Sequence, residues 1–372
     1  MKLTVIQTLP ALESGGVERG TVEVALELAR RGHRAIVVSA GGRLVGKLEA
    51  AGVEHVCLAI GRKSPLTLRL VGPLRRLMLE RRADILHTRS RLPGWISYMA
   101  WRSLPRGART HFVTTVHGPY TPNFYSAVMT RGERIIAISE FIREYILRHY
   151  RVEPARVRVI PRGVSPAEFP HGFRPSAEWL ARWQGEHPGI GERLLLTLPA
   201  RITRWKGQED FLELLRLLRE RRLDVHGVLV GPAERRREPF LRELQRRSAA
   251  FGLEDRVTFT GHRDDIREIM SISAAVLSLA REPEAFGRTA LEALSLGVPV
   301  VAYDHGGAGE ILGRVFPGGL VAPGDVRAAA ERVAGFCAAR PTVPAEIPFT
   351  LQRMLDETLA LYAELAGAPA PS

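Results

Sequence analysis

The sequence predicts an α/β protein of two domains, each built on a parallel sheet. The chain has 372 residues, more than one domain of ordinary size requires. In both halves short apolar runs alternate with segments of helical period, the pattern of strands joined by crossover helices. Between the halves lies a stretch rich in proline and glycine, residues 157–175, without helical period. We interpret that stretch as the linker between the domains.

The apolar runs give the expected strands in chain order. The first half has Lys2–Thr8, Arg34–Ser39, Glu54–Ala59, Asp84–His87, Phe112–His117, Arg134–Ile138 and Arg158–Ile160. The second half has Leu194–Pro199, Val225–Val230, Val257–Thr260, Ala275–Leu279 and Val298–Ala302. Helices are expected in the gaps, and a last amphipathic helix at Phe349–Tyr362.

The first strand is followed by Ser14, Gly15 and Gly16, and then by a helical segment. Glycines between a strand and a helix let the backbone approach a phosphate closely. Their spacing is not that of the dinucleotide fingerprint, and the second strand runs into Ala40 and Gly41 rather than an acidic residue. A nicotinamide-dependent enzyme is therefore disfavoured.

The segment 281–297, REPEAFGRTALEALSLG, is the expected working centre. Pro283 favours a loop, Gly287 permits a tight turn, and the helix that follows presents free N–H groups to an anion. Glu284 and Glu292 flank this point, and carboxylates accept hydrogen bonds from sugar hydroxyls. For either glutamate alone, an ordinary solvated helix residue would be the simpler interpretation.

Other polar residues follow expected strands in the same way. Arg201 and Lys206 precede a helix start and suit a diphosphate, although a solvated charge pair would explain them equally well in isolation. His117 stands at the carboxyl end of a strand, where ligands gather in open α/β sheets. Gly306 and Gly307 precede another helix and form a second, weaker anion nest.

The Glu284 to Glu292 spacing with AFGRTAL between, and the pattern Arg201-x-x-x-x-Lys206-Gly207, resemble the motifs of retaining glycosyltransferases of family 4. The resemblance implies the GT-B fold, two facing Rossmann-like domains with an interdomain cleft. It implies an acceptor-binding domain at 1–165, a nucleotide-sugar-binding domain at 166–345, and a closing helix at 346–372 that returns to the first domain.

The resemblance also implies roles for residues. His117 and Glu284 would contact the transferred sugar as catalytic residues, and Glu292 would bind the ribose. The remaining donor contacts would be Gly15, Gly16, Arg201, Lys206, Gly231, Gly261, His262, Arg263, Phe286, Gly287, Arg288 and Thr289. The donor would be a co-substrate, with no other cofactor and no metal, since the D-x-D pair of the other main glycosyltransferase fold is absent from the sequence.

Two cysteines far apart, Cys57 and Cys337, and an N-terminus without a signal-peptide core lead us to expect a cytoplasmic protein. The net charge of +13 implies an anionic partner, or merely the composition of the source genome. A non-catalytic protein that binds nucleotides or nucleic acid is the alternative function. That alternative gives no reason for Glu284 and Glu292 beside an anion site, so we expect no nucleic-acid partner.

Residues 61–110 carry much of the positive charge: Arg62, Lys63, Arg69, Arg75, Arg76, Arg81, Arg82, Arg89, Arg91, Arg102, Arg106 and Arg109. Trp95, Tyr98 and Trp101 lie close together in the same segment. Cations with neighbouring aromatics suit an anionic bilayer surface. We therefore expect peripheral binding at the inner membrane face and a glycan or lipid-linked acceptor, such as a lipopolysaccharide precursor. The alternative is that these helices are packed on one face, with the aromatics buried.

Overall fold

The structure, a computed structural model, describes residues 2–13, 15–108 and 110–367. Within them the chain forms two compact units. Unit 1 is Met1–Pro161 together with Gln352–Ser372, and unit 2 is Arg162–Leu351. The boundaries therefore fall at 161/162 and 351/352, against the 165/166 and 345/346 that the sequence suggested.

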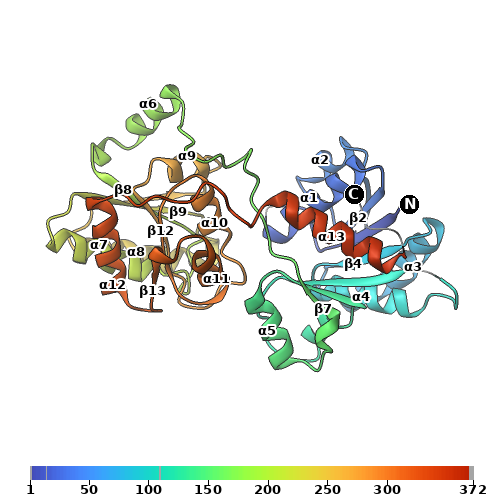
Figure 1. Cartoon of the computed structure of the whole chain (residues 1–372). Helices are drawn as coiled ribbons and strands as arrows, with labels where there is room; N and C mark the ends of the chain where they lie inside the picture. The colour runs from blue at the N-terminus through green and yellow to red at the C-terminus, as the bar shows by residue number, and fades with distance from the viewer. Residues whose placement is uncertain (1, 14, 109, 368–372) are drawn as a thin grey trace. The chain divides into compact units, whose positions relative to one another are not determined.

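In its described residues, unit 1 has a seven-stranded parallel sheet in the order β3-β2-β1-β4-β5-β6-β7 (Figure 1). The strands are β1 (Thr4–Thr8), β2 (Arg34–Ser39), β3 (Glu54–Cys57), β4 (Ile85–Thr88), β5 (His111–Val116), β6 (Arg134–Ala137) and β7 (Val157–Val159). The helices are α1 (Gly16–Arg30), α2 (Val45–Glu49), α3 (Val71–Glu80), α4 (Arg91–Arg102) and α5 (Glu140–His149), with 3-10 turns η1 (Pro65–Leu70), η2 (Ser126–Thr130) and η3 (Pro154–Arg156).

Unit 2 has a six-stranded parallel sheet among its described residues, in the order β10-β9-β8-β11-β12-β13. The strands are β8 (Leu194–Pro199), β9 (Val225–Val230), β10 (Val257–Gly261), β11 (Ala275–Ser278), β12 (Val300–Tyr303) and β13 (Leu320–Val321). The helices are α6 (Ala177–Glu186), α7 (Gln208–Glu220), α8 (Glu238–Ala250), α9 (Ile266–Ser271), α10 (Arg288–Ser295), α11 (Gly306–Val315) and α12 (Val326–Ala338), with short turns at Pro188–Ile190, Arg235–Arg237 and Pro317–Gly319.

The strand order in each sheet reverses once, and this reversal determines where loops diverge. In unit 1 the chain leaves β1 toward β2 on one side and returns to β4 on the other, and in unit 2 the same happens at β8 and β11. Ligands of open α/β sheets bind outside the carboxyl ends of the strands at such a switch point. Ligands are therefore expected at the carboxyl ends of β1 and β4 in unit 1 and at those of β8 and β11 in unit 2.

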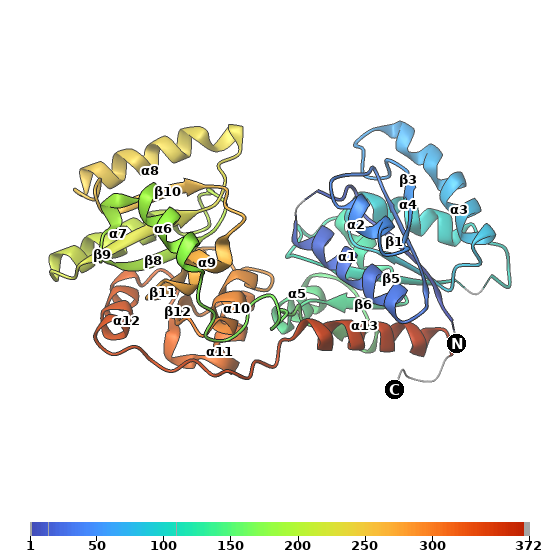
Figure 2. The same cartoon turned by 90° about the horizontal axis from the view of Figure 1, so that it is seen from above.

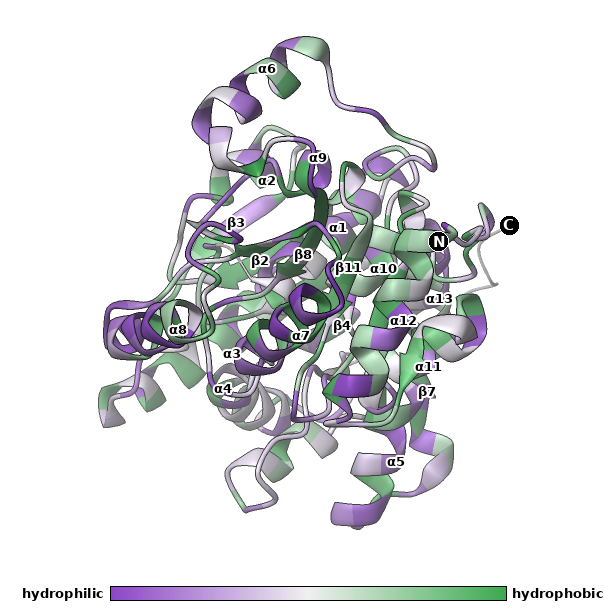
Figure 3. Ribbon diagram, turned by 90° about the vertical axis from the view of Figure 1, so that its left-hand side faces the viewer, coloured by the Kyte–Doolittle hydropathy of each residue, from purple (hydrophilic) through white to green (hydrophobic). Residues whose placement is uncertain are grey.

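Inner strands such as β2 and β9 are buried on both faces, which is why they are mostly apolar runs. In unit 2 the strand β8 is coloured as hydrophobic and α8 as mostly hydrophilic (Figure 3). Phe211 and Leu215 of α7 are fully buried against this sheet. Helix α7 covers the sheet with this face because its apolar side chains recur at helical spacing.

The last helix, α13 (Leu351–Leu365), joins unit 1 and lies beside α1 (Figures 1 and 2). Arg31 of α1 forms an ion pair with Asp356 of α13. Tyr362 is fully buried, and its hydroxyl forms a hydrogen bond with Nδ1 of His87 on β4. Burial raises the pKa of Tyr362 to about 12, so the hydroxyl keeps its proton.

Among the described residues, no helix combines the length and apolar character that crossing a bilayer requires.

His226 on β9 gives unit 2 a pH dependence. Its Nε2 lies 2.8 Å from Thr258 Oγ1, and burial lowers its pKa from 6.5 to about 4. As the pH falls, the unfolded chain protonates this histidine before the folded protein does. The contribution of the neutral His226 to the free energy of unfolding is therefore present above about pH 6.5 and is lost as pH falls toward 4. We expect His226→Gln to be less stable than wild type at neutral pH, with the difference shrinking between pH 6.5 and 4. Thermal unfolding of both proteins across this range measures it, and a constant difference would contradict the assignment.

Candidate functional site

The loop between β11 and α10 has the conformation that the sequence suggested. Gly287 caps α10 with φ at 88°, a left-handed value that favours glycine. The helix then runs from Arg288 to Ser295, so the backbone N–H groups of its first turn face out of the loop. The loop and the helix start thus form the anion-binding geometry expected of this segment.

The start of α11 supports this loop from behind. The Gly307 amide donates to the Glu284 carbonyl over 2.7 Å. A Cβ atom at Gly307 would overlap the Phe286 backbone, and one at Gly306 would lie 2.6 Å from the Glu284 carbonyl oxygen. Gly306 and Gly307 therefore serve as close backbone contacts of the loop. The sequence alone suggested instead that they form an anion nest of their own.

Lys206 and Glu284 meet at the switch point of unit 2. The Lys206 ammonium forms an ion pair with the Glu284 carboxylate, and the two side chains are only 19% and 14% exposed. The ammonium also lies 4.4 Å from the centre of the Trp205 ring. The sequence pointed to each residue separately, and the structure brings them into direct contact across two loops.

Glycine 207 makes this contact geometrically feasible. Its φ is 77°, and a Cβ atom there would overlap the carbonyl of Leu279, just beyond the end of β11. The loop after β8 can therefore lie directly against the loop after β11. Gly231 has a similar function after β9, since a Cβ atom there would overlap the Ala200 carbonyl.

A buried charge network fastens the same two loops, and sequence reasoning missed it. Asp210 in the first turn of α7 is 7% exposed. It accepts hydrogen bonds from Arg281 and, over 2.9 Å, from the Tyr303 hydroxyl on β12. The Arg281 amide donates to the Trp205 carbonyl over 2.7 Å. Hydrogen bonding to Asp210 raises the pKa of Arg281, and burial raises that of Tyr303. In the sequence, only the acidic first turn of α7 and the cation Arg281 hinted at this network. The distance between them along the chain matches no known motif, so the sequence did not predict that they pair.

Glu292 and Arg288 lie one turn apart on α10. Glu292 is 6% exposed and accepts a hydrogen bond from Arg288 Nε over 2.9 Å. The carboxylate is therefore a buried, positioned acceptor, which excludes the solvated helix residue of the simpler interpretation. Thr289 follows in the first turn, half-buried. The Phe286 side chain packs inside unit 2 against Phe349, with ring centroids 6.1 Å apart, so only its backbone belongs to the loop.

The remaining expected donor residues of unit 2 are more dispersed. Arg201 follows β8, is 64% exposed and lies 3.6 Å from Glu234. His262 is exposed beside Asp264, while the Gly261 carbonyl accepts from the Gly231 amide over 2.8 Å. Arg263 pairs with Asp265 and with Glu186 of α6. These pairs fix the turn after β10.

In unit 1 the expected residues lie at the carboxyl ends of the strands. Gly15 caps α1 in an extended conformation, with the Glu18 carboxylate folded close to it, and Gly16 begins the helix with open space around its Cα. His117 follows the last residue of β5. Ser14 lies outside the described residues.

Arg89, which sequence reasoning counted among surface cations, is fully buried at this edge. Its guanidinium donates to the Gln7 side-chain oxygen on β1 over 3.0 and 2.6 Å, and burial lowers its pKa. The Gln7 amide in turn donates to the Thr21 carbonyl of α1 over 3.1 Å. The residue therefore joins β4, β1 and α1 beneath the Gly15 loop.

The basic segment of residues 61–110 is only partly a surface. Tyr98 and Trp101 pack on Phe112 with centroids 6.0 and 5.5 Å apart, so these two aromatics belong to the core. Arg81 pairs with Glu54. The exposed cations of the segment are Arg62, Lys63, Arg69, Arg76, Arg82, Arg102 and Arg106, and Arg109 lies outside the described residues.

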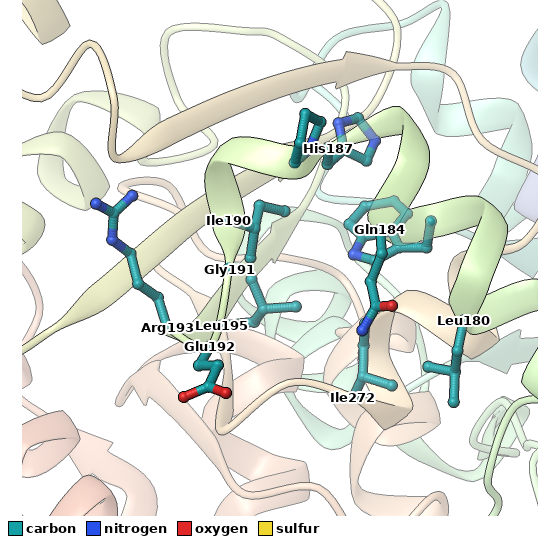
Figure 4. A pocket seen from close by; sticks show the side chains of 11 residues that line it. Leu180, Gln184, His187, Ile190, Gly191, Glu192, Arg193, Leu195 and Ile272 are labelled. Carbon is teal, nitrogen blue, oxygen red and sulfur yellow. The ribbon is translucent and has the colours of Figure 1, made fainter.

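Unit 2 also has a cavity of about 410 Å³ away from these loops (Figure 4). It lies between α6, the turn at His187–Ile190 and the start of β8, at the amino end of that strand. Lys206 and Glu284 lie beyond the carboxyl ends of β8 and β11, so the cavity is separate from their site. In the described part of the chain, no group of three or more His, Cys, Asp and Glu side chains could hold a metal ion.

Comparisons with known proteins identify the family of the chain. The model of Glycosyltransferase Family 4 matches residues 14–168, and that of Glycosyl transferases group 1 matches residues 183–342. A solved glycosyltransferase from Rickettsia africae ESF-5 is 31% identical, covers 98% of both chains and superposes with a TM-score of 0.87.

Two curated relatives have named activities. N-acetyl-alpha-D-glucosaminyl L-malate synthase of Bacillus anthracis is 24% identical over 89% of this chain and 87% of its own. The lipopolysaccharide core biosynthesis mannosyltransferase LpsB of Rhizobium meliloti (strain 1021) is 33% identical, over 39% of this chain and 42% of its own. The two family models and the match of both sheets to solved glycosyltransferases lead to one conclusion: the chain belongs to glycosyltransferase family 4, has the GT-B fold and transfers a sugar from a nucleotide-sugar donor.

Proposed function

We propose that the protein is a retaining glycosyltransferase that needs no metal ion, with the Lys206–Glu284 pair at its donor site. This pair is the observation that carries the proposal. A lysine ammonium balances the charge that develops on a departing diphosphate, and a carboxylate accepts hydrogen bonds from sugar hydroxyls. Both groups are largely shielded from water. Interactions between charges are stronger in such a shielded place than in water.

Other residues take supporting roles in this proposal. The N–H groups of the first turn of α10 bind the diphosphate, and the buried Glu292 accepts from the ribose hydroxyls. Arg201 contributes from an exposed position. Gly15, Gly16 and His117 are assigned to the donor phosphates and the sugar by resemblance to the family.

The proposed reaction is a same-face substitution at the anomeric carbon. The bond between that carbon and the diphosphate oxygen breaks, and a bond to the acceptor hydroxyl oxygen forms on the same face. The departing diphosphate oxygen takes the hydroxyl proton. Lys206 stabilises the diphosphate, and Glu284 orients the sugar.

For the acceptor we propose a lipid-linked glycan of the cell envelope, bound while unit 1 lies on the inner membrane face. The support is the surface at η1. Leu66 and Leu68 are 60% and 55% exposed, and the neighbouring Arg62, Lys63 and Arg69 are exposed as well. Exposed leucines among cations suit an anionic bilayer. The relative from Rhizobium meliloti is named for lipopolysaccharide core biosynthesis, which favours this acceptor class.

The η1 surface lies near the expected functional edge of unit 1. A Cβ atom at Gly61, just before it, would lie within 2.6 Å of Pro10, in the loop after β1. A bilayer touching Leu66 and Leu68 would therefore lie close to the carboxyl ends of the strands. A small soluble acceptor, such as the L-malate in the name of the Bacillus anthracis relative, is the other outcome.

Donor binding tests the site. A nucleotide sugar at 100 times its Kd stabilises the protein by about 2.7 kcal/mol, which a thermal-shift panel of nucleotide sugars detects.

We expect Lys206→Ala to reduce the rate of sugar transfer by about 10²–10³-fold, as when other preorganised electrostatic groups are removed. The matched loss of charge in Arg201→Ala should cost less, because that side chain is largely exposed. Equal and near-normal rates for both variants would show that these are surface charges.

The reaction class has its own test. Chelation with EDTA should leave the rate unchanged, and proton NMR of the product should show the anomeric configuration of the donor. Inversion at the anomeric carbon would contradict the same-face mechanism, and loss of activity restored by added magnesium would contradict the proposed role of the cations.

Sedimentation with phosphatidylglycerol vesicles tests the membrane contact. Binding should be strong at low salt and fade at high salt, since each near-surface cation adds about 1 kcal/mol and is screened. We expect Leu66→Gln with Leu68→Gln to release the protein into the supernatant. Leu194→Gln is the matched control, because Leu194 is 44% exposed on unit 2. Wild-type protein that stays in the supernatant at low salt would favour a soluble acceptor.

A further inference from the structure

An exposed phenylalanine, stacked on a half-buried tryptophan, lies at the carboxyl-end edge of the unit 1 sheet. Phe124 is 75% exposed, and its ring stacks on Trp95 with centroids 4.8 Å apart and planes 30° apart. A large apolar side chain is usually buried, so an exposed ring aligned on a second ring offers a preformed binding surface. We call Trp95 and Phe124 the aromatic platform.

The aromatic platform is held in place from both sides. Trp95 Nε1 donates to the Tyr125 carbonyl over 2.9 Å, and the Tyr98 ring meets Trp95 edge-on at 6.3 Å. The Tyr145 hydroxyl of α5 donates to the Tyr120 carbonyl over 2.7 Å and so anchors the loop that carries Phe124. Fixed rings lose little conformational entropy when a ligand binds.

Arg91 gives this surface a positive charge. Its guanidinium lies 4.8 Å from the centre of the Tyr120 ring and 5.3 Å from that of Tyr125. Among the described residues it makes no ion pair with a carboxylate, and its one side-chain hydrogen bond is with Ser126, at 3.5 Å. Residues 91–102 and 117–130, which build the surface, contain no Asp or Glu. The guanidinium is therefore available for an anionic ligand group.

The aromatic platform also belongs to the same loop as His117. That loop runs from the end of β5 at Val116 to η2, which starts at Ser126, and it carries His117, Tyr120 and Phe124. A ligand on the aromatic platform would thus contact the loop that also carries the histidine assigned to the transferred sugar. Every residue of this surface lies in unit 1.

We propose that Trp95, Phe124 and Arg91 form an acceptor subsite for a sugar ring that bears an anionic substituent, a phosphate or a carboxylate. The proposal rests on the proposed glycosyl transfer and names its acceptor class. The C–H face of a pyranose packs on the electron-rich faces of aromatic rings. The planar guanidinium of Arg91 suits both oxygens of a phosphate or carboxylate.

Ligand-observed NMR titration of the full-length protein tests the subsite without a donor. Glucose 6-phosphate and glucuronic acid carry the ring with either anion, methyl glucoside carries the ring alone, and glycerol 3-phosphate carries the anion alone. We expect at least one anionic sugar to bind about tenfold more tightly than methyl glucoside and than glycerol 3-phosphate. The stronger of the two anionic sugars identifies the substituent.

Variants separate the two parts of the subsite. Phe124→Ala should weaken the binding of the anionic sugars about tenfold, while its thermal midpoint stays near wild type, because the ring is exposed. Arg91→Gln should abolish the preference for anionic sugars over methyl glucoside. Arg102→Gln removes the same charge from the other end of α4 and should leave that preference intact. Trp95→Phe keeps a ring but loses the bond to Tyr125, and should give an intermediate loss.

Three outcomes would overturn the proposal. In the first, glycerol 3-phosphate binds as tightly as the anionic sugars. In the second, Phe124→Ala and Arg91→Gln bind them as wild type does. In the third, Phe124→Ala reduces vesicle sedimentation but not sugar binding, which would make the aromatic platform a membrane contact. Failure of the glycosyl-transfer proposal would appear separately, as no stabilisation by any nucleotide sugar.

Discussion

The buried carboxylate of Asp210 is the interaction on which the unit 2 site depends. Arg281 reaches it from the loop after β11, Tyr303 from β12, and Asp210 itself lies in the first turn of α7. A buried charge is tolerated only when it is paired and hydrogen-bonded. Removing Arg281 would leave the Asp210 carboxylate buried without a balancing charge, so this pairing holds the three elements in one arrangement. Lys206 and Glu284 lie on the two loops that this network joins, and their contact follows from it.

Backbone proximity is the second constraint. Gly207 lies against the Leu279 carbonyl, and Gly307 against the Phe286 backbone. In both places a side chain would push apart two loops that carry site residues. These glycines thus allow the loops of unit 2 to pack closely, whereas glycines in such sequence motifs are usually interpreted as phosphate contacts. The two functions are compatible at Gly287, where the left-handed turn also starts α10.

The sequence predicted the architecture well because the strands are buried runs at regular intervals. Each expected strand is present within about two residues at either end, and only the two-residue β13 was missed, since so short a segment has no period. The site was predicted as separate residues. That Lys206 bonds Glu284, 78 residues later, could not be inferred, because the contact depends on strand order rather than on spacing.

Other contacts escaped the sequence for a different reason. Arg263, expected near the donor, is paired with Asp265, and Arg89, counted among the cations of residues 61–110, is buried on Gln7. Tyr98 and Trp101 have the spacing of a surface cluster, but they are half-buried and pack against the core at Phe112, as the alternative interpretation expected. Sequence patterns report residue type and period, and neither tells which face of a helix the neighbouring strand will cover.

The return of α13 to unit 1 also bears on how the chain is made. Unit 2 is one continuous stretch, and all of it leaves the ribosome before Tyr362 does. The first unit, although synthesised first, lacks its partner for His87 until that last helix emerges. Domains usually fold in order from the N-terminus during synthesis. Here the whole of the second unit is synthesised before the closing helix, and the first unit is finished only when that helix docks.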